Sequence, residues 1–151
     1  MRPDVGLNVT TWGTGDPAVL VHGSFGRGEA TWKEQRPLAE SHRLLLVDRR
    51  GFGGSPSAGS VDFDLDADDV ASLLEQDAHL VGHRVRTLVV RGDWRDTPPR
   101  ARELGRAALH AVCDVLEREL GAASATLPAA HNPQLLGPPF NDCVRSFWES
   151  V

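Results

Sequence analysis

The residues most informative about possible chemistry are Gly82, His83 and Arg84. Gly82 and His83 fill the first two positions of a G-x-S-x-G turn, and they follow a mostly apolar run that starts at residue 79. Such a turn lifts a serine oxygen above the edge of a sheet, where it can attack a carbonyl carbon. Here the third position is Arg84 and the fifth is Arg86. The chain therefore carries the approach to an acyl-transfer nucleophile and lacks the nucleophile.

A candidate general base is His131. It follows a predicted strand over 124–127 and precedes a helix that is predicted to start near Pro138. An imidazole accepts the proton of a nucleophile when a carboxylate fixes its tautomer. A thiol does not replace the absent serine, because Cys113 falls in the middle of a helical pattern, where a core-facing or half-buried side chain is expected.

These residues have to be positioned by strands and helices that alternate along the chain. Apolar runs typical of strands occur at 7–12, 18–21, 43–47, 79–82 and 87–90. Those at 18–21, 43–47 and 79–82 are continuous, which indicates strands buried on both faces. Helical spacing is found over 66–76 and 98–120, and Gly121 is a suitable helix stop. This order predicts an α/β fold with a mostly parallel sheet and helices on both faces.

The loops that follow the predicted strands begin at His22, Asp48 and His83. In parallel sheets, ligands bind beyond the carboxyl ends of the strands. We therefore expect these glycine-rich, histidine-bearing loops to share the edge where an active site belongs.

Five motifs resemble those of the α/β-hydrolase family, in the order in which that family has them. They occupy residues 21–26, 48–55, 80–83, 88–93 and 129–132. The resemblance covers most of the chain and implies an incomplete three-layer α/β-hydrolase-like sandwich of the serine-hydrolase lineage. It also implies hydrolysis of small-molecule substrates through a Ser-His-Asp mechanism.

The same resemblance gives the first loop a role. Residues His22, Gly23, Ser24 and Phe25 correspond to the family's oxyanion loop, whose backbone N–H groups stabilise a developing negative charge. A complete oxyanion hole also needs the N–H of the residue after the nucleophile, and Arg84 stands in the nucleophile's place.

His131 corresponds to the family's catalytic histidine, and its acid partner is open between two residues. The family often has an aspartate three residues after the glycine that corresponds to Gly92, and that position is Arg95. Asp93 and Asp96 lie on either side of the expected position. We favour Asp96, because a loop easily accommodates a shift of one residue.

The short spacing at the junction limits how the strands there can pair. Only four residues separate the runs 79–82 and 87–90, whereas parallel neighbours need a crossover of about a dozen. The alternatives are a single strand over 79–91, an antiparallel hairpin, or a run that is not a strand. In each of them the family's middle strands and lid segment are absent, and Arg84 is the seam of a deletion.

We therefore expect one truncated domain over 1–151. The N-terminal half of its core lies in 1–83 and the C-terminal part in 84–151. The absent strands should leave apolar sheet surface uncovered, and a homo-oligomer formed through that surface is the expected way to cover it.

Composition argues against several other classes. The net charge of −5 argues against a nucleic-acid surface. No apolar run approaches the ~20 residues of a membrane span, and the polar N-terminus lacks the apolar part of a secretion signal. A cytoplasmic protein with free cysteines is expected. The acidic run 62–69 lacks the glycine of a calcium loop and should open a helix instead, so neither a metal nor another cofactor is expected.

Two functions of different classes remain open. By resemblance the chain is a hydrolase of ester-like or other small-molecule substrates, and residual turnover would depend on water activated by His131. The alternative is a non-catalytic remnant, or a binding or self-associating module, because the nucleophile is absent.

Restoring the serine alone should not restore catalysis. The Arg84→Ser variant still lacks the turn's second glycine and the helix behind it, so the hydroxyl is not held in the strained geometry that exposes it. We expect the variant to hydrolyse p-nitrophenyl esters no faster than the parent protein. Substantial ester hydrolysis by Arg84→Ser would show that the junction is not a deletion.

Overall fold

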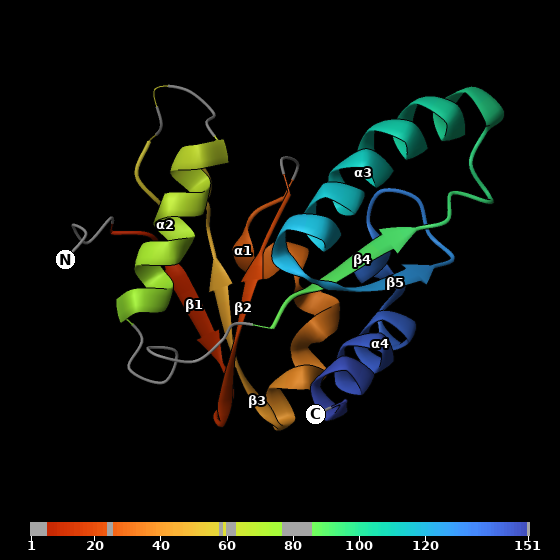
Figure 1. The fold of residues 1–151 in the computed structure, drawn as a ribbon. Helices are drawn as coiled ribbons and strands as arrows, with labels where there is room; N and C mark the ends of the chain where they lie inside the picture. The colour runs from red at the N-terminus through yellow and green to blue at the C-terminus, as the bar shows by residue number, and fades with distance from the viewer. Residues whose placement is uncertain (1–5, 24–25, 58, 60–62, 77–85, 151) are drawn as a thin grey trace. The chain divides into compact units, whose positions relative to one another are not determined.

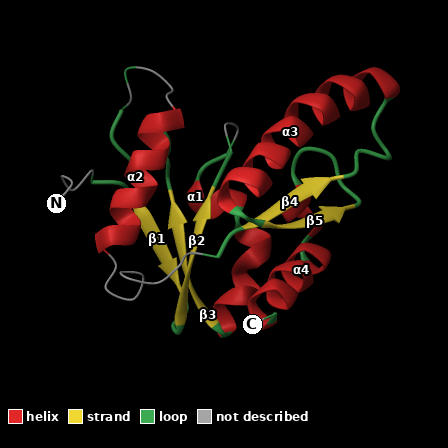
Figure 2. Ribbon diagram, in the orientation of Figure 1, coloured by secondary structure: helices red, strands yellow, loops and turns green. Residues whose placement is uncertain are grey.

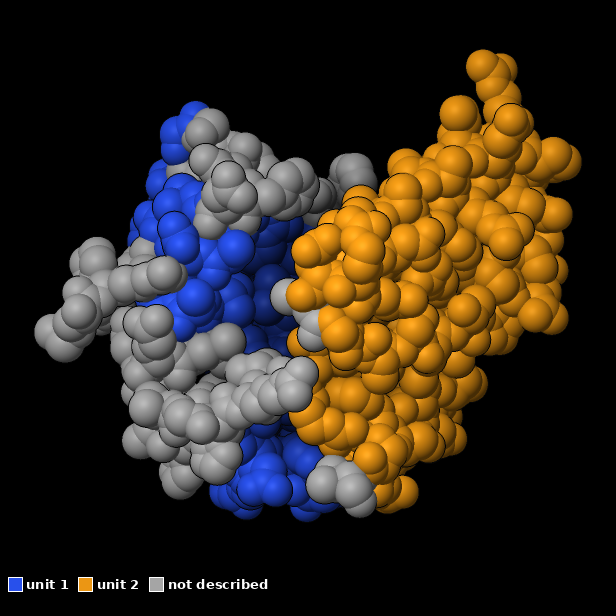
Figure 3. All heavy atoms as spheres, in the orientation of Figure 1, with its two compact units in different colours: residues 1–84 blue, residues 85–151 orange. Residues whose placement is uncertain are grey.

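The structure, a computed structural model, describes residues 6–23, 26–57, 59, 63–76 and 86–150. The chain divides into two units, Met1–Arg84 and Val85–Val151, which have different colours in Figure 3. The predicted strand over 79–82 and the junction residues His83 and Arg84 lie outside the described residues. Within the described residues, the first unit has a sheet of three strands and the second a pair of strands.

The first unit is built around strand β3 (His42–Val47). This strand lies between β1 (Val9–Trp12), to which it is antiparallel, and β2 (Asp16–Val21), to which it is parallel (Figure 1). Its last four residues, Leu44 to Val47, are buried on both faces of the sheet. The prediction of a buried strand over 43–47 is confirmed, because a central strand is covered on both sides and hydrogen-bonded at both edges.

Strand β2 differs from its prediction. The apolar run 18–21 was expected to be buried on both faces, but its residues are half-buried, and Val21 is 38% exposed. The reason is its position, since β2 is an edge strand of the sheet that the described residues form. A continuous apolar run reports hydrophobicity and does not distinguish a central strand from an outer one.

Two short helical segments connect β2 to β3, namely α1 (Gly28–Thr31) and the 3-10 helix η1 (Lys33–Glu40). Leu38 of η1 is fully buried, and η1 contacts β3. Helix α2 (Phe63–Gln76) follows the glycine-rich loop after β3 and begins three residues before its predicted start. The parallel pair β2 and β3 with its helical crossover is the element expected of an α/β sheet.

The second unit is a β-α-β arrangement followed by a helix. Its elements are β4 (Leu88–Gly92), α3 (Pro99–Leu120), β5 (Ala123–Leu127), the 3-10 helix η2 (Pro133–Leu136) and α4 (Pro138–Glu149). Strands β4 and β5 are parallel, α3 contacts β4 and α4 contacts β5. The two helices lie on opposite sides of the strand pair (Figure 2), so this unit has the layered order of an α/β fold.

Helix α3 has the bounds that its sequence predicts. Pro99 occupies its first turn, where a missing N–H costs nothing. Gly121 ends the helix in the left-handed region, with φ of 61°, and its N–H bonds to the Glu117 carbonyl. Cys113 is half-buried, as expected. No helix among the described residues is both long enough and apolar enough to cross a membrane.

Truncation of a β3 leucine should cost far more than truncation of its neighbour on β2. Leu46 is 1% exposed, and its register partner Leu20 is half-buried. We expect Leu46→Ala to lower the free energy of unfolding by about 3 kcal/mol, because the deletion leaves a cavity. The matched Leu20→Ala change should cost about half as much. Urea unfolding followed by circular dichroism measures both, and equal losses would contradict the central position of β3.

Candidate functional site

The loop after β3 is organised by the carboxylate of Asp48. One oxygen accepts the Gly28 N–H at 2.7 Å. The other accepts the Gly54 N–H at 3.0 Å and the Asn8 side-chain amide at 2.8 Å. The Ser55 hydroxyl donates to the Asp48 carbonyl at 2.6 Å. One buried side chain thus holds together the start of α1, the glycine-rich loop and the segment before β1.

These bonds keep Asp48 ionised. Burial raises the pKa of its carboxyl, but the hydrogen bonds from Gly54, Asn8 and Gly28 outweigh burial and hold the pKa below its usual value. The glycine at position 53 follows from the same geometry. Gly53 has φ of +51°, and a Cβ there would overlap the Asp48 carboxylate. The aspartate and the glycines of the sequence motif therefore form one structural unit.

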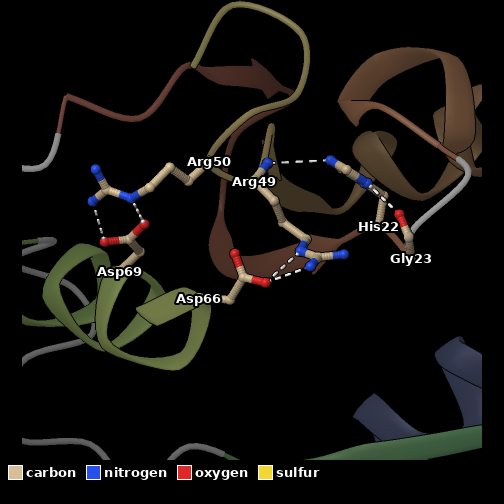
Figure 4. Close-up of polar contacts among 6 residues, drawn as sticks. All are labelled: His22, Gly23, Arg49, Arg50, Asp66 and Asp69. Carbon is tan, nitrogen blue, oxygen red and sulfur yellow. Dashed lines mark hydrogen bonds and ion pairs between the residues drawn. The ribbon is translucent and has the colours of Figure 1, made fainter. Parts of the chain in front are cut away.

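His22, just after β2, forms hydrogen bonds through both ring nitrogens, one to the loop after β3 and one to the loop after β2 (Figure 4). Its Nε2 accepts the Arg49 N–H at 3.1 Å, so the other nitrogen carries the hydrogen. That nitrogen, Nδ1, donates to the Gly23 carbonyl at 2.7 Å. The ring is 3% exposed and contacts the Phe52 ring edge-on, with 5.1 Å between centroids. His22 therefore joins the loops after β2 and β3, and neither nitrogen is available as a base.

Two arginines tie the β3 loop to helix α2. Arg49 bonds to Asp66 through Nε at 3.0 Å and also through Nη2, and Arg50 binds both oxygens of Asp69 at 2.9 and 2.7 Å (Figure 4). Both Arg49 donors share one oxygen of Asp66, whereas the Arg50–Asp69 pair is bidentate and fixes orientation as well as charge. The acidic run was predicted to open a helix, and it lies mostly inside α2 because that helix begins at Phe63.

Sequence reasoning missed these ion pairs, although a signal was present. Arginines 49 and 50 are adjacent and follow a strand, and aspartates 66 and 69 are three residues apart in a helix. Residues at that spacing share a helix face. Pairing the two adjacent arginines with the two aspartates on one helix face would have predicted both ion pairs.

The oxyanion loop is only partly described. His22 and Gly23 are placed, and the Gly26 N–H lies 3.4 Å from the Gly23 carbonyl oxygen. Ser24 and Phe25, which would supply the oxyanion donors by resemblance, lie outside the described residues.

In the second unit, the loops after β4 and β5 are joined by backbone hydrogen bonds. The Asp93 N–H bonds to the Leu127 carbonyl at 2.9 Å, and the Trp94 N–H bonds to the Ala129 carbonyl at 2.8 Å. Trp94 adopts a left-handed backbone with φ of 59°, which is uncommon for a residue other than glycine. A Cβ at Gly92 would overlap the carbonyl of Ala129, so glycine is required for this close approach.

The two candidate acids lie in different surroundings. Asp93 is half-buried at the end of β4 and accepts the Arg95 N–H at 2.9 Å and its Nε at 2.5 Å. The Arg95 N–H, opposed by burial and aided by the Arg95 side chain and Arg106, holds the pKa of Asp93 below its usual value. Asp96 is exposed in the following turn, and His131 is exposed on a bend two residues after Ala129.

Two further observations concern thiol and metal chemistry among the described residues. Burial raises the pKa of the Cys143 thiol, which disfavours the thiolate. Among the described residues, no group of histidine, cysteine and acidic side chains has the arrangement of a metal site. The first unit offers an ionised carboxylate at Asp48 and a histidine whose two nitrogens are bonded. The second unit offers an ionised carboxylate at Asp93 and the exposed His131.

Comparisons with known proteins agree with this architecture. The model of the alpha/beta hydrolase family matches residues 18–83. A pimeloyl-[acyl-carrier protein] methyl ester esterase from Aeromonas hydrophila is 33% identical over 144 residues, which cover 93% of this chain and 56% of the relative. A non-heme chloroperoxidase from Kitasatospora aureofaciens is 37% identical over 89 residues, which cover 54% and 32% of the two chains.

Together, the parallel strands, the glycine-rich loops at their ends and these matches define an α/β protein with hydrolase relatives. The chain is similar to the alpha/beta hydrolase family over residues 18–83, and to one of its esterases over most of its length. It spans little more than half the length of the esterase and about a third of the chloroperoxidase. Among solved structures, an esterase from Thermogutta terrifontis has 28% identity and a TM-score of 0.46 over 75% of this chain and 48% of its own.

Removal of the Asp48 charge should destabilise the first unit. An amide in its place has one acceptor oxygen for three N–H donors, so we expect Asp48→Asn to lower the free energy of unfolding by about 2 kcal/mol at pH 7. The exposed Asp16→Asn change is the control, with an effect below about 0.5 kcal/mol.

This difference should depend on pH. The folded pKa of Asp48 lies below its unfolded value of ~3.9, so its stabilisation is complete above that value and is lost as the pH falls through the folded pKa. The gap between the parent and Asp48→Asn should therefore shrink below about pH 4. Urea unfolding at stepped pH measures it, and a gap that stays constant into acid would refute the role given to the carboxylate.

Proposed function

We propose that this chain is a serine-hydrolase-lineage protein that has kept the frame of an ester-cleaving site but does not turn over esters. The observation that carries the proposal is the sequence Gly82-His83-Arg84, in which arginine occupies the nucleophile position. Acyl transfer through a covalent intermediate requires a hydroxyl or thiol there. The function would then be non-catalytic, as a remnant or a binding module.

Two findings support an interruption at this point. The match to the family model ends at His83, and the division of the chain into two units falls between Arg84 and Val85. The esterase relative aligns on both sides of this point, because the alignment covers 93% of the chain. The interruption is therefore supported by the family model and by the division into two units, whereas the esterase alignment crosses this point with no gap the size of the family's middle strands.

The remaining site residues support the same proposal. Both ring nitrogens of His22 are bonded to backbone groups, so this histidine cannot move a proton without breaking the loop. The carboxylate of Asp93 is engaged by Arg95 through both oxygens. A catalytic acid must instead point at the other imidazole nitrogen of the base.

A second candidate is weak hydrolysis by water activated at His131. The observation that favours it is the bond between Trp94 and Ala129, which holds the acid-bearing loop beside the histidine-bearing loop. Of the two acids, Asp93 is closer to this connection along the chain, and it is ionised. The substrates would be small esters, since the relatives include a methyl ester esterase.

An ester panel combined with a fluorophosphonate probe tests the proposal. We expect no labelling of the monodisperse protein, and no turnover of methyl or p-nitrophenyl esters above that of an equal concentration of free histidine. The reason is that no serine stands in the strained turn that activates it. An active serine esterase run in parallel confirms that the probe and the substrates are competent.

Variants separate the two candidates. Turnover that is lost in His131→Ala, or labelling by the probe, would overturn the non-catalytic proposal. In the first case, the pair Asp93→Asn and Asp96→Asn would then identify the acid, because only the true partner should lower the rate by a factor of ten or more. Unchanged circular dichroism shows that a variant has not simply unfolded.

A further inference from the structure

Helix α3 presents an apolar face that its own unit leaves uncovered. Four of the seven large apolar side chains that are exposed among the described residues belong to it, namely Leu104 (65%), Val112 (56%), Val115 (45%) and Leu116 (39%). Scattered exposed apolar residues are ordinary, but a cluster on one helix marks an interaction surface.

The uncovered residues follow a regular spacing. Ala101, Leu104, Ala108, Ala111 and Val115 alternate by three and four positions, and all five are exposed. We call these five residues the α3 stripe. Spacing of this kind is that of the two contact positions of a helical seam, and its alanines allow two helices to approach closely.

The other face of α3 is the one that contacts β4 and the loop after it. On that face, His110 Nε2 lies 3.0 Å from the Gly92 carbonyl oxygen, and seven residues farther on Glu117 pairs with Arg91. Gly105, where a Cβ would overlap the Trp94 ring, lies instead at the border of the stripe, beside Ala101 and Ala108. The helix is therefore held in place by one face while the stripe faces away.

Charge along α3 is divided between its two halves. Residues 99–109 contain three arginines and one glutamate, a net charge of +2. Residues 110–120 contain two glutamates, one aspartate and one arginine, a net charge of −2. When two such helices lie side by side in parallel, halves of like charge face each other and repel; in the antiparallel arrangement, halves of opposite charge face each other and attract. The antiparallel arrangement also places the two helix dipoles in opposite directions, which is favourable.

From these observations we propose that α3 is a homodimer surface, on which a second copy of this chain places its own α3 antiparallel. A two-fold axis between Ala108 and Ala111 brings Leu104 opposite Val115 of the second copy. The same axis brings Ala108 opposite Ala111 of the second copy, so every position of the seam meets an apolar partner of the same stripe except Ala101, which meets Arg118. Isologous pairing of this kind closes and does not extend into a fibre.

The expected strength is modest. A helix of 22 residues is about 33 Å long, and one helix seam lies at the lower end of the size of specific interfaces. The dissociation constant should be on the order of 1–100 μM, and it should rise with salt because the two charged halves attract across the seam.

Sedimentation equilibrium of the full chain over a range of concentrations tests the dimer. We expect a reversible monomer–dimer equilibrium that Leu104→Glu and Val115→Glu each weaken by a factor of about ten or more, because each places two charges in the apolar seam. Leu135→Glu is the matched control, since Leu135 is 54% exposed on η2, outside the stripe, and it should leave the dissociation constant unchanged.

Cysteine cross-linking tests the direction. In a background with Cys113→Ala and Cys143→Ala, an oxidised mixture of Leu104→Cys and Val115→Cys proteins should give a mixed disulfide dimer in higher yield than either variant alone. A monomer at all concentrations, a dimer insensitive to both glutamate variants, or preferential cross-linking of Leu104→Cys to itself would each overturn the proposal.

Discussion

The carboxylate of Asp48 is the interaction on which the first unit depends. It is the side chain to which three separated segments bring N–H groups, and it is buried, so each bond replaces one that water would otherwise make. The ends of β2 and β3 are then fixed relative to each other by His22, whose ring bonds to the backbone of the residue that follows Asp48. In this way a polar cluster sets the shape of the strand ends, while the leucines of β3 supply the hydrophobic stabilisation.

The fold could be predicted from the sequence wherever local signals and tertiary packing agree. Helix α3 begins and ends where its proline and glycine place it, since these residues act on the backbone directly. The prediction of a buried β3 held because its apolar run falls in the central strand of the sheet. The exposure of β2 could not be predicted, because it depends on which strands lie beside it and not on its own residues.

The candidate site was predictable as a set of loops and less so as a set of contacts. The glycine-rich segments do lie at the strand ends, since the turns there need left-handed backbone or close approach, as at Gly53 and Gly92. The role of His22 as a neutral connector was not predicted, because a tautomer is fixed by partners that are distant in sequence. The assignments of His131 and Asp96 remain predictions.

The division of the chain between Arg84 and Val85 has a consequence for how the gene can change. Each unit has its own sheet and its own polar connections between strand ends. The side chains of Asp48 and His22 make them in the first unit, and the backbone N–H groups of Asp93 and Trp94 make them in the second. Loss or gain of coding sequence between the two units leaves both sets of connections intact. A change in chain length at this boundary therefore disturbs neither sheet directly, whereas the same change inside a strand would shift its register.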